Sequence, residues 1–173
     1  MLKRIYVAGN GFGSGKNWFS EKLSEKLKLP WYDQDDIAWK KKFTIPKPRS
    51  VKRKMLKKIY DKNKWIICGS GYSYIGKIPN KAQLIIFLNT SRVRANLSVV
   101  KRYFQRKLKG EYDSLRNVAG IIASKRSSRD HDFLKKMKKR FPKKTIILSN
   151  KQKNKFLKDM DFKSETYKYW FDL

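Results

Sequence analysis

Two residue types that build disulfides and metal sites are almost missing from this sequence. Its 173 residues contain one cysteine, Cys68, and one histidine, His131. A single cysteine excludes an internal disulfide framework and suits a reducing compartment, so we expect a cytoplasmic protein. Zinc sites usually combine several Cys and His ligands, so zinc chemistry is not expected.

Long apolar runs are missing as well. No stretch is long enough to cross a bilayer, so no membrane partner is expected. The first residues, MLKRIYVAG, lead directly into a strand-like pattern and lack the apolar stretch and cleavage site of a signal peptide. Hydrophobic residues still make up 40% of the chain, which is enough to bury a core. We therefore expect a single globular domain over residues 1–173.

Acidic residues are scarce. The chain has 14 Asp and Glu against 44 Lys and Arg, which gives a formal net charge of +30. So basic a protein attracts polyanions, and non-specific nucleic-acid binding by charge is expected. The cations are spread through nearly every segment, and most are Lys, which recognises phosphate less specifically than Arg. Composition alone therefore favours no dedicated nucleic-acid function.

Apolar strands alternate with amphipathic helices along the chain. Strands are predicted in KRIYVA, LPWYDQDD, KWIICGSG, AQLIIFLN and KKTIILS. Helices are predicted between them, because apolar residues such as Phe19, Leu23 and Leu27 recur at helical spacing. This alternation is typical of a parallel sheet with helices on both faces. We predict an α/β fold with about five parallel strands.

Several segments have functional or structural interpretations of their own. Residues 40–48 are basic, contain two prolines and are predicted to be a connection. Residues 107–128 contain two glycines and are predicted to form a mobile lid. On the long helix before that lid, Val100 and Phe104 are expected to face the core. The aromatic tail TYKYWFDL is expected to dock onto the domain.

The stretch AGNGFGSGKN, residues 8–17, predicts a phosphate-binding loop. Glycines let backbone N–H groups turn inward, and the following helix adds the dipole of its N-terminus. The pattern G-x-x-x-x-G-K-[ST] is matched at Gly15 and Lys16, whereas Asn10 and Asn17 replace its first glycine and its hydroxyl residue. Asn10 is expected to be a mild change, because Asn tolerates left-handed backbone angles. The residues expected to bind the nucleotide are Gly11, Gly13, Ser14, Gly15, Lys16, Asn17 and Arg92.

Four segments carry a family resemblance. They are the glycine-rich loop, the stretch from Leu29 to Trp39, WIICGSGYS at 65–73 and AQLIIFLNTSR at 82–92. In this order they resemble the adenylate kinase-like P-loop proteins, and within them the DNA topology modulation proteins, from about Arg4 to Leu157. The resemblance implies a three-layer P-loop fold that binds ATP. It also implies transfer of the γ-phosphoryl group to a nucleotide or another small hydroxyl compound.

The resemblance suggests catalytic roles for four residues. Lys16 would hold the β- and γ-phosphates, and Asp35 would orient or deprotonate the acceptor hydroxyl. Arg102 and Arg106 are one helical turn apart and would neutralise phosphate charge from one helix face. For Asp35 a solvated acidic loop is an equally open interpretation, and it is preferred for Asp33 and Asp36. A solvated basic face is preferred for each arginine taken alone.

Three departures from the family concern magnesium. Asn17 replaces a Ser or Thr, and Cys68 and Asn89 replace acidic residues at the ends of two strands. Magnesium prefers hydroxyl and carboxylate oxygens, and a thiol is a poor ligand for it. We expect ATP to bind with weakly held Mg²⁺, with Asn17 as the remaining side-chain ligand. Because phosphoryl transfer depends on the metal, a non-catalytic nucleotide-dependent binding protein stays open, as does a nucleic-acid-associated protein.

Overall fold

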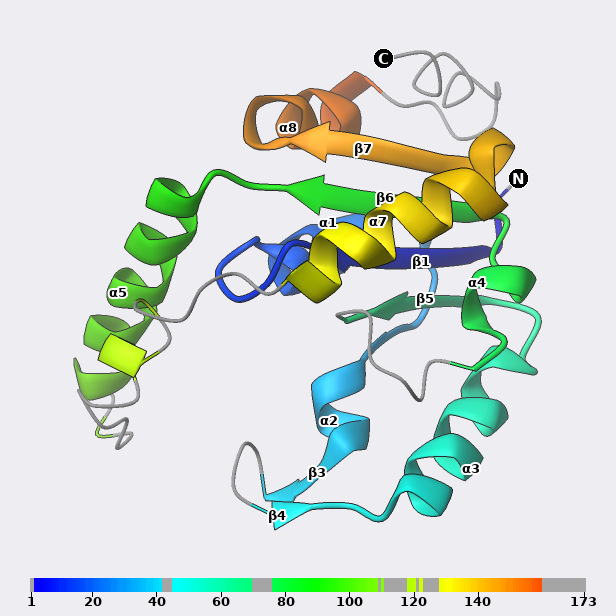
Figure 1. The fold of residues 1–173 in the computed structure, drawn as a ribbon, viewed down its shortest axis with the longest axis horizontal. Helices are drawn as coiled ribbons and strands as arrows, with labels where there is room; N and C mark the ends of the chain where they lie inside the picture. Colours follow the sequence, from blue (N-terminus) through cyan, green and yellow to red (C-terminus); the bar gives the residue numbers. More distant parts are fainter. Residues whose placement is uncertain are drawn as a thin grey trace.

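The structure is a computed structural model that describes residues 2–41, 45–69, 76–108, 110, 118–120, 122 and 128–159. A central sheet of five parallel strands has the order β2-β5-β1-β6-β7, as Figure 1 shows. Its strands are β1 (Arg4–Gly9), β2 (Trp31–Asp33), β5 (Trp65–Cys68), β6 (Leu84–Asn89) and β7 (Thr145–Ser149). The predicted parallel sheet of about five strands is confirmed.

Helices cover both faces of the sheet. The helices described are α1 (Lys16–Leu27), α2 (Gln34–Ala38), α3 (Arg49–Tyr60), α4 (Ile78–Lys81), α5 (Arg92–Leu108), α7 (Ser128–Arg140) and α8 (Asn150–Asp159), with a 3₁₀ turn at Pro142–Lys144. All of them except α5 pack along the sheet. The expected helices between the strands are therefore present, and the short helices α2 and α4 are additions. No helix in the described part of the chain is long and apolar enough to cross a membrane.

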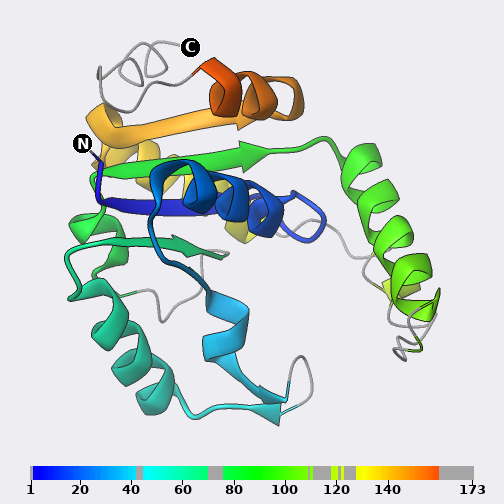
Figure 2. The same cartoon turned by 180° about the vertical axis from the view of Figure 1, so that it is seen from behind.

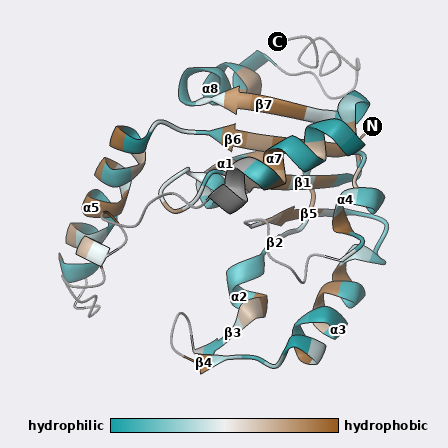
Figure 3. Cartoon of the chain, viewed as in Figure 1, coloured by the Kyte–Doolittle hydropathy of each residue, from teal (hydrophilic) through white to brown (hydrophobic). Residues whose placement is uncertain are grey.

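Two hydrophobic cores result from the alternation of side chains along the strands. One face of the sheet packs against α1 and α8, with Phe19 and Phe156 fully buried there. The other face packs against α2, α3, α4 and α7, with Leu56 and Ile78 fully buried. Figure 2 shows the α1 and α8 side, and Figure 3 shows the apolar strands between the helical layers. The near-continuous apolar strands follow from burial on both sides.

Strand β1 lies where the order in which the chain adds strands to the sheet reverses. The chain passes from β1 to β2 and β5 on one side, and then to β6 on the other. The crevice beyond the carboxyl ends of β1 and β6 is therefore the switch point, where ligands bind in open α/β sheets. The loop 10–15 and the residues after Asn89 line this point.

The segment predicted to be a plain connection contains a small hairpin. Strands β3 (Trp39–Lys41) and β4 (Ile45–Pro46) pair antiparallel, with an irregular register. Pro46 is compatible with such a pair because a two-stranded ribbon consists of edge strands only. Composition concealed this element, because very short edge strands need no apolar run.

Helix α5 forms as predicted, but the face predicted to be buried is exposed. Val93, Leu97, Phe104 and Leu108 form a solvent-facing stripe, and Phe104 is 57% exposed. The buried side of the helix carries Ala95, which is 1% exposed. In Figures 1 and 2 the helix extends away from the sheet beyond the carboxyl ends of the strands. The prediction that Phe104 faces the core is wrong, because α5 buries other positions, Ala95 and Tyr103. Val100 is half-buried.

Candidate nucleotide site

The loop after β1 has the backbone of an anion-binding turn. Gly11, Gly13 and Gly15 have φ of 99°, 73° and 81°, a left-handed region that L side chains rarely adopt. A Cβ on Gly13 would lie 2.2 Å from the carbonyl oxygen of Ala95, so the loop packs directly onto the first turns of α5. Gly15 is the N-cap of α1. The loop therefore turns onto a helix N-terminus, where backbone N–H groups favour negative charge.

Lys16 and Ser14 occupy this loop. The Lys16 ammonium donates to the carbonyl oxygen of Gly11 at 3.1 Å and to Ser14 Oγ at 3.4 Å. Ser14 is fully buried, and its hydroxyl donates to the same carbonyl at 3.0 Å. The sequence therefore places a cation next to the helix N-terminus, the combination that a phosphate group requires.

Asn10 has a structural role that differs from the expected one. Its backbone is not left-handed, since Lys28 is the one non-glycine residue with positive φ in the described chain. Instead the Asn10 amide donates to Asn89 Oδ1 at 2.9 Å and to the Thr90 carbonyl at 3.0 Å, and it accepts from the Thr90 N–H at 3.2 Å. Thr90 Oγ1 also donates to the Ser14 carbonyl at 3.0 Å. Asn10 therefore links the loop to the end of β6 by hydrogen bonds, and Asn89 accepts one of them.

The expected magnesium residue, Asn17, lies beside a carboxylate. Its amide nitrogen donates to Asp33 Oδ2 at 2.6 Å, and the Cys68 thiol donates to its amide oxygen at 3.8 Å. Asp33 and Cys68 are register partners at the carboxyl ends of β2 and β5. Asp33 is 6% exposed, so its interpretation as a solvated residue is wrong. The signal that could have identified it is its place directly after the apolar part of the predicted strand in LPWYDQDD, where strand carboxyl ends gather in a parallel sheet.

The Cys68 thiol does not replace a carboxylate. Burial raises the pKa of the Cys68 thiol to about 12, and the nearby Asp33 carboxylate adds to the rise. The thiol is therefore neutral near pH 7 and is a poor ligand for a hard cation. No group of three or more His, Cys, Asp or Glu residues suited to a metal occurs in the described chain. Asp33 and the Asn17 oxygen fit magnesium only as an ion whose remaining ligands are phosphate and water.

Asp35 lies one loop away from the phosphate loop. Its backbone N–H donates to Asp33 Oδ1 at 2.9 Å, so Asp33 caps the short helix α2 and holds Asp35 in its first turn. Asp35 is half-buried, and its charge also contributes to the raised pKa of Cys68. Asp36 is exposed, as expected for a solvated residue. The structure thus places the Asp35 carboxylate at the same edge of the sheet as Asn17 and Asp33.

Gln34 was not identified from the sequence. It is fully buried, and neither heteroatom of its amide has a hydrogen-bond partner among the residues that the structure describes. It packs against Gly69, where a Cβ would lie 1.9 Å from Gln34 Oε1. Leaving such groups unpaired costs about 1–3 kcal/mol each, which makes Gln34 an unusual core residue at the end of β2. A lone Gln gives no sequence signal of this kind.

The arginines of α5 share the side of the helix that meets the loop. Arg102 and Arg106 follow Ala95 by seven and eleven positions, which places all three on one side. Arg102 is exposed and Arg106 is half-buried. At 1.5 Å per residue they lie about 10 and 16 Å along the axis from Ala95. Arg92 is exposed at the first position of the helix. Helical spacing therefore places Arg102 and Arg106 on the side of α5 that carries Ala95, but beyond direct contact with the loop.

A second pair of cations, Lys153 and Arg94, lies closer to the loop than Arg102 and Arg106. A Cβ on Gly15 would lie 2.9 Å from Lys153 Nζ, so Lys153 on α8 reaches the start of α1. Burial lowers the pKa of Lys153, and the charge of Arg94 lowers it further. Neither residue could be distinguished in a sequence so rich in Lys and Arg.

Some predicted features lie outside the described residues. These are most of the lid at 107–128 and the aromatic tail at 166–173. Tyr72, a weak candidate from the sequence for the wall of an acceptor pocket, and Arg126, a weak candidate for phosphate contact, also lie there. Arg129 and His131 lie within α7, but their side chains are not described. Trp39 is half-buried and packs against the core on the α3 side, which fits a packing aromatic.

Comparison with known proteins yields matches in structure alone. No family model and no curated protein matches the chain. A shikimate kinase from Acinetobacter baumannii in complex with shikimate is similar at a TM-score of 0.53 and 15% identity, covering 92% of this chain and 90% of that one. A shikimate kinase from Bacteroides thetaiotaomicron matches at 0.52 and 18%, covering 95% and 99%. A gluconokinase from Sinorhizobium meliloti 1021 matches at 0.51 and 15%, covering 91% and 89%. At these identities the likeness shows the fold alone, which this chain shares with these three kinases.

Proposed function

We propose that this protein binds ATP and transfers its γ-phosphoryl group to a hydroxyl of a small molecule. The observation that carries the proposal is the loop of left-handed glycines at the N-terminus of α1, with the Lys16 ammonium inside it. Three structures with the same fold are named shikimate kinase or gluconokinase, which favours a small-molecule acceptor over a nucleotide. The narrower likeness to DNA topology modulation proteins remains a prediction from the sequence.

The residues around the loop divide into two groups by chemistry. Backbone N–H groups of residues 11–16 and the Lys16 ammonium bind and orient the phosphates. Asn17 and Asp33 would hold magnesium, which supplies charge neutralisation at the transferring group when it is bound. Asp33 also positions Asp35 through the cap of α2. Asp35 then accepts the proton of the acceptor hydroxyl as that oxygen attacks phosphorus.

The Arg-bearing side of α5 completes the proposed site. Arg102 and Arg106 lie on the side of the helix that packs onto the loop, and their guanidinium groups would pair with phosphate oxygens as charge develops. Lys153 and Arg94 add positive charge beside Gly15. In this basic setting the phosphates depend less on a metal for neutralisation.

An acceptor screen tests the reaction. Small hydroxyl compounds are incubated with ATP and the protein, and both ADP and the phosphorylated compound are measured. Asp35→Asn should retain ATP affinity and lose most turnover, about a hundredfold or more. Asp36→Asn is the matched control, since Asp36 is an exposed carboxylate one position away. Equal turnover in the two variants would remove Asp35 from the role of base.

A non-catalytic nucleotide-binding protein is the second candidate. The observation in its favour is that the Asn17 amide oxygen faces the neutral thiol of Cys68 instead of standing beside a second carboxylate. If ATP binds and no acceptor yields product with any divalent ion, this candidate replaces the kinase.

A further inference from the structure

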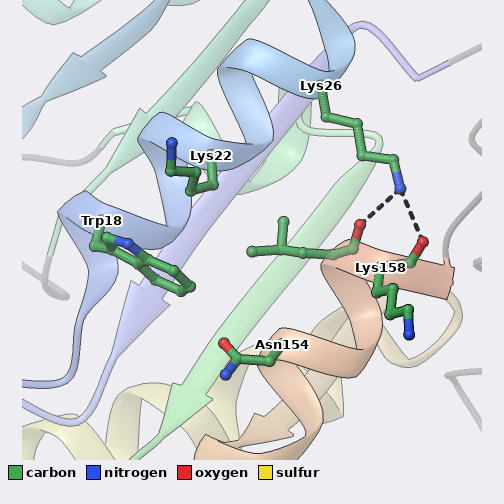
Figure 4. A pocket seen from close by; sticks show the side chains of 6 residues that line it. Trp18, Lys22, Lys26, Asn154 and Lys158 are labelled. Atoms are coloured by element: carbon green, nitrogen blue, oxygen red, sulfur yellow. Dashed lines mark hydrogen bonds between the residues drawn. The ribbon is translucent and has the colours of Figure 1, made fainter.

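A basic groove separates α1 and α8 on the face of the sheet opposite α3 and α7. It has a volume of about 390 Å³. Its lining residues are Trp18, Lys22, Lys26, Asn154, Leu157 and Lys158. Figure 4 shows these side chains, three from each helix, on the two sides of the groove. The groove lies outside the phosphate loop but begins next to it, since Trp18 follows Lys16 by two residues.

An aromatic ring marks the end of the groove nearest the loop. Trp18 is 45% exposed, although it is a large apolar side chain in the first turn of a helix. Lys153 Nζ lies 5.7 Å from the centre of its ring, which is a cation–π arrangement. Leu157 packs at the edge of the core beneath, so the groove has an apolar base. An exposed indole beside an apolar base and a cation is suited to a flat ring that carries a nearby negative charge.

The sides of the groove are positively charged. Three of the six lining residues are lysines, and none is acidic. Lys26 is engaged, because it donates to the carbonyl oxygens of Leu157 and Lys158 at 2.6 and 3.3 Å and ties the two helices together. Lys22 pairs with Glu25 at 2.7 Å on the exposed side, a contact of little energetic value in water. Lys22 and Lys158 are therefore available to an incoming anion.

We propose that this groove binds single-stranded nucleic acid. A base stacks on Trp18, and the phosphates that follow lie between Lys22 and Lys158. Aromatic platforms in positively charged grooves are the usual means of binding single strands without sequence preference. From Trp18 to Lys26 the α1 side extends about 12 Å, enough for a short stretch of nucleotides. A duplex fits less well, because its bases are stacked on each other and leave the indole unused.

The proposal is independent of the phosphoryl-transfer function. It depends on the groove and not on Lys16, Asp35 or magnesium. The net charge of +30 gives the whole surface some affinity for nucleic acid. Trp18, Lys22 and Lys158 should therefore contribute more to the affinity for single strands than other surface residues do.

Fluorescence anisotropy with a labelled oligothymidylate of about ten nucleotides tests this. The titrations use the full chain at about 0.15 M salt and at several lower concentrations. Trp18→Ala should weaken binding about 5- to 150-fold, the range expected when one stacked base loses its platform. Trp18→Phe should restore most of the affinity. Lys22→Ala with Lys158→Ala should lower the slope of log affinity against log salt by about 1.4, or about 0.7 for each phosphate that is no longer neutralised.

A matched pair on the opposite face controls for net charge. Lys135→Ala with Lys139→Ala removes the same charge from exposed positions on α7. Equal losses of affinity in the two lysine pairs would mean diffuse attraction only and would overturn the proposal. Unchanged oligonucleotide binding in Trp18→Ala would also overturn the proposal. This holds even if the variant loses affinity for ATP or for phosphatidylglycerol vesicles, which would assign the groove to one of those ligands instead. Unfolding temperatures of all variants verify that they fold, and Lys16→Ala should retain oligonucleotide binding.

Discussion

At the scale of single residues, Asn17 is the most informative position in the site. Its amide is held between the Asp33 carboxylate at 2.6 Å and the Cys68 thiol at 3.8 Å, so contacts within the protein orient its oxygen. A hydroxyl at this position could ligate magnesium and still donate to Asp33. These three residues would decide the strength of the proposed magnesium site, and the change at position 17 is the one that a short hydroxyl side chain can reverse.

Asn17→Ser should therefore strengthen the dependence on magnesium. We expect turnover with any accepted substrate to rise several-fold and to saturate at lower magnesium than in the parent, because a hydroxyl oxygen is added to the ligand set. Steady-state rates over a magnesium series measure this, with Asn17→Ala as the control that removes the amide without adding an oxygen. Saturation of the parent at low magnesium with fast turnover would show that its metal site is not weakened.

Cys68 should be chemically inert in the folded protein. Its pKa of about 12 lies above the ordinary value of 9.0, so the reactive thiolate is scarce near neutral pH. Because the pKa of this thiol is higher in the folded state than in the unfolded state, its protonation stabilises the folded protein. This stabilisation is fully present below about pH 9 and is lost as the pH rises toward 12. Alkylation by iodoacetamide should be slow in the native state and fast in denaturant. Rapid native-state alkylation at mildly alkaline pH would contradict the buried, neutral thiol.

At the scale of elements, the phosphate loop and α5 behave as one unit. Gly13 lies against the Ala95 carbonyl, and Asn10 and Thr90 join the loop to the end of β6. Displacement of the loop would thus move the start of α5, and a movement of α5 would displace the loop. This contact anchors the first turns of the helix, whereas its outer stripe is exposed.

Gly13→Ala should disrupt that unit. The new Cβ would lie 2.2 Å from the Ala95 oxygen at a φ of 73°, so both crowding and backbone strain oppose it. We expect a loss of stability of more than about 1 kcal/mol, with a lower unfolding temperature and weaker ATP binding. Gly120→Ala is the control, because nothing lies within 4 Å of a Cβ there. Similar unfolding temperatures for the two variants would show that the contact with α5 is not required.

Arg106→Ala tests the side of α5 that faces the loop. If the guanidinium stabilises charge in the transition state, kcat should fall about a hundredfold while ATP affinity changes little. Lys101→Ala removes a cation from the same helix at an exposed position on its other side and should leave kcat unchanged. Equal effects of the two substitutions would assign Arg106 to the general positive charge of the surface.

At the scale of the whole molecule, the sequence predicts the architecture because burial on both faces leaves a strong pattern. Strands such as LIIFLN at β6 are apolar at almost every position, and the spacing of Phe19 and Leu23 predicts α1. The phosphate loop is predictable for a similar reason, since its glycines are a local requirement of the backbone.

The remaining features depend on contacts between distant segments. Asp33 meets Asn17 only because β2 ends beside β5, and Lys153 reaches Gly15 only because α8 packs beside α1. The exposed stripe on α5 misled the prediction because an amphipathic pattern does not say which face meets the domain. Such relations follow from topology, which local composition does not encode.

The central claim is that the loop at residues 10–16 is an ATP site whose affinity depends little on magnesium. Calorimetric titration of ATP with magnesium and with EDTA tests it most directly, using the parent, Lys16→Ala and Lys54→Ala, an exposed lysine of α3. We expect similar affinity under both conditions, a loss of about 10- to 100-fold in Lys16→Ala and no change in Lys54→Ala. The absence of ATP binding in the parent, or binding that Lys16→Ala leaves intact, would contradict the claim.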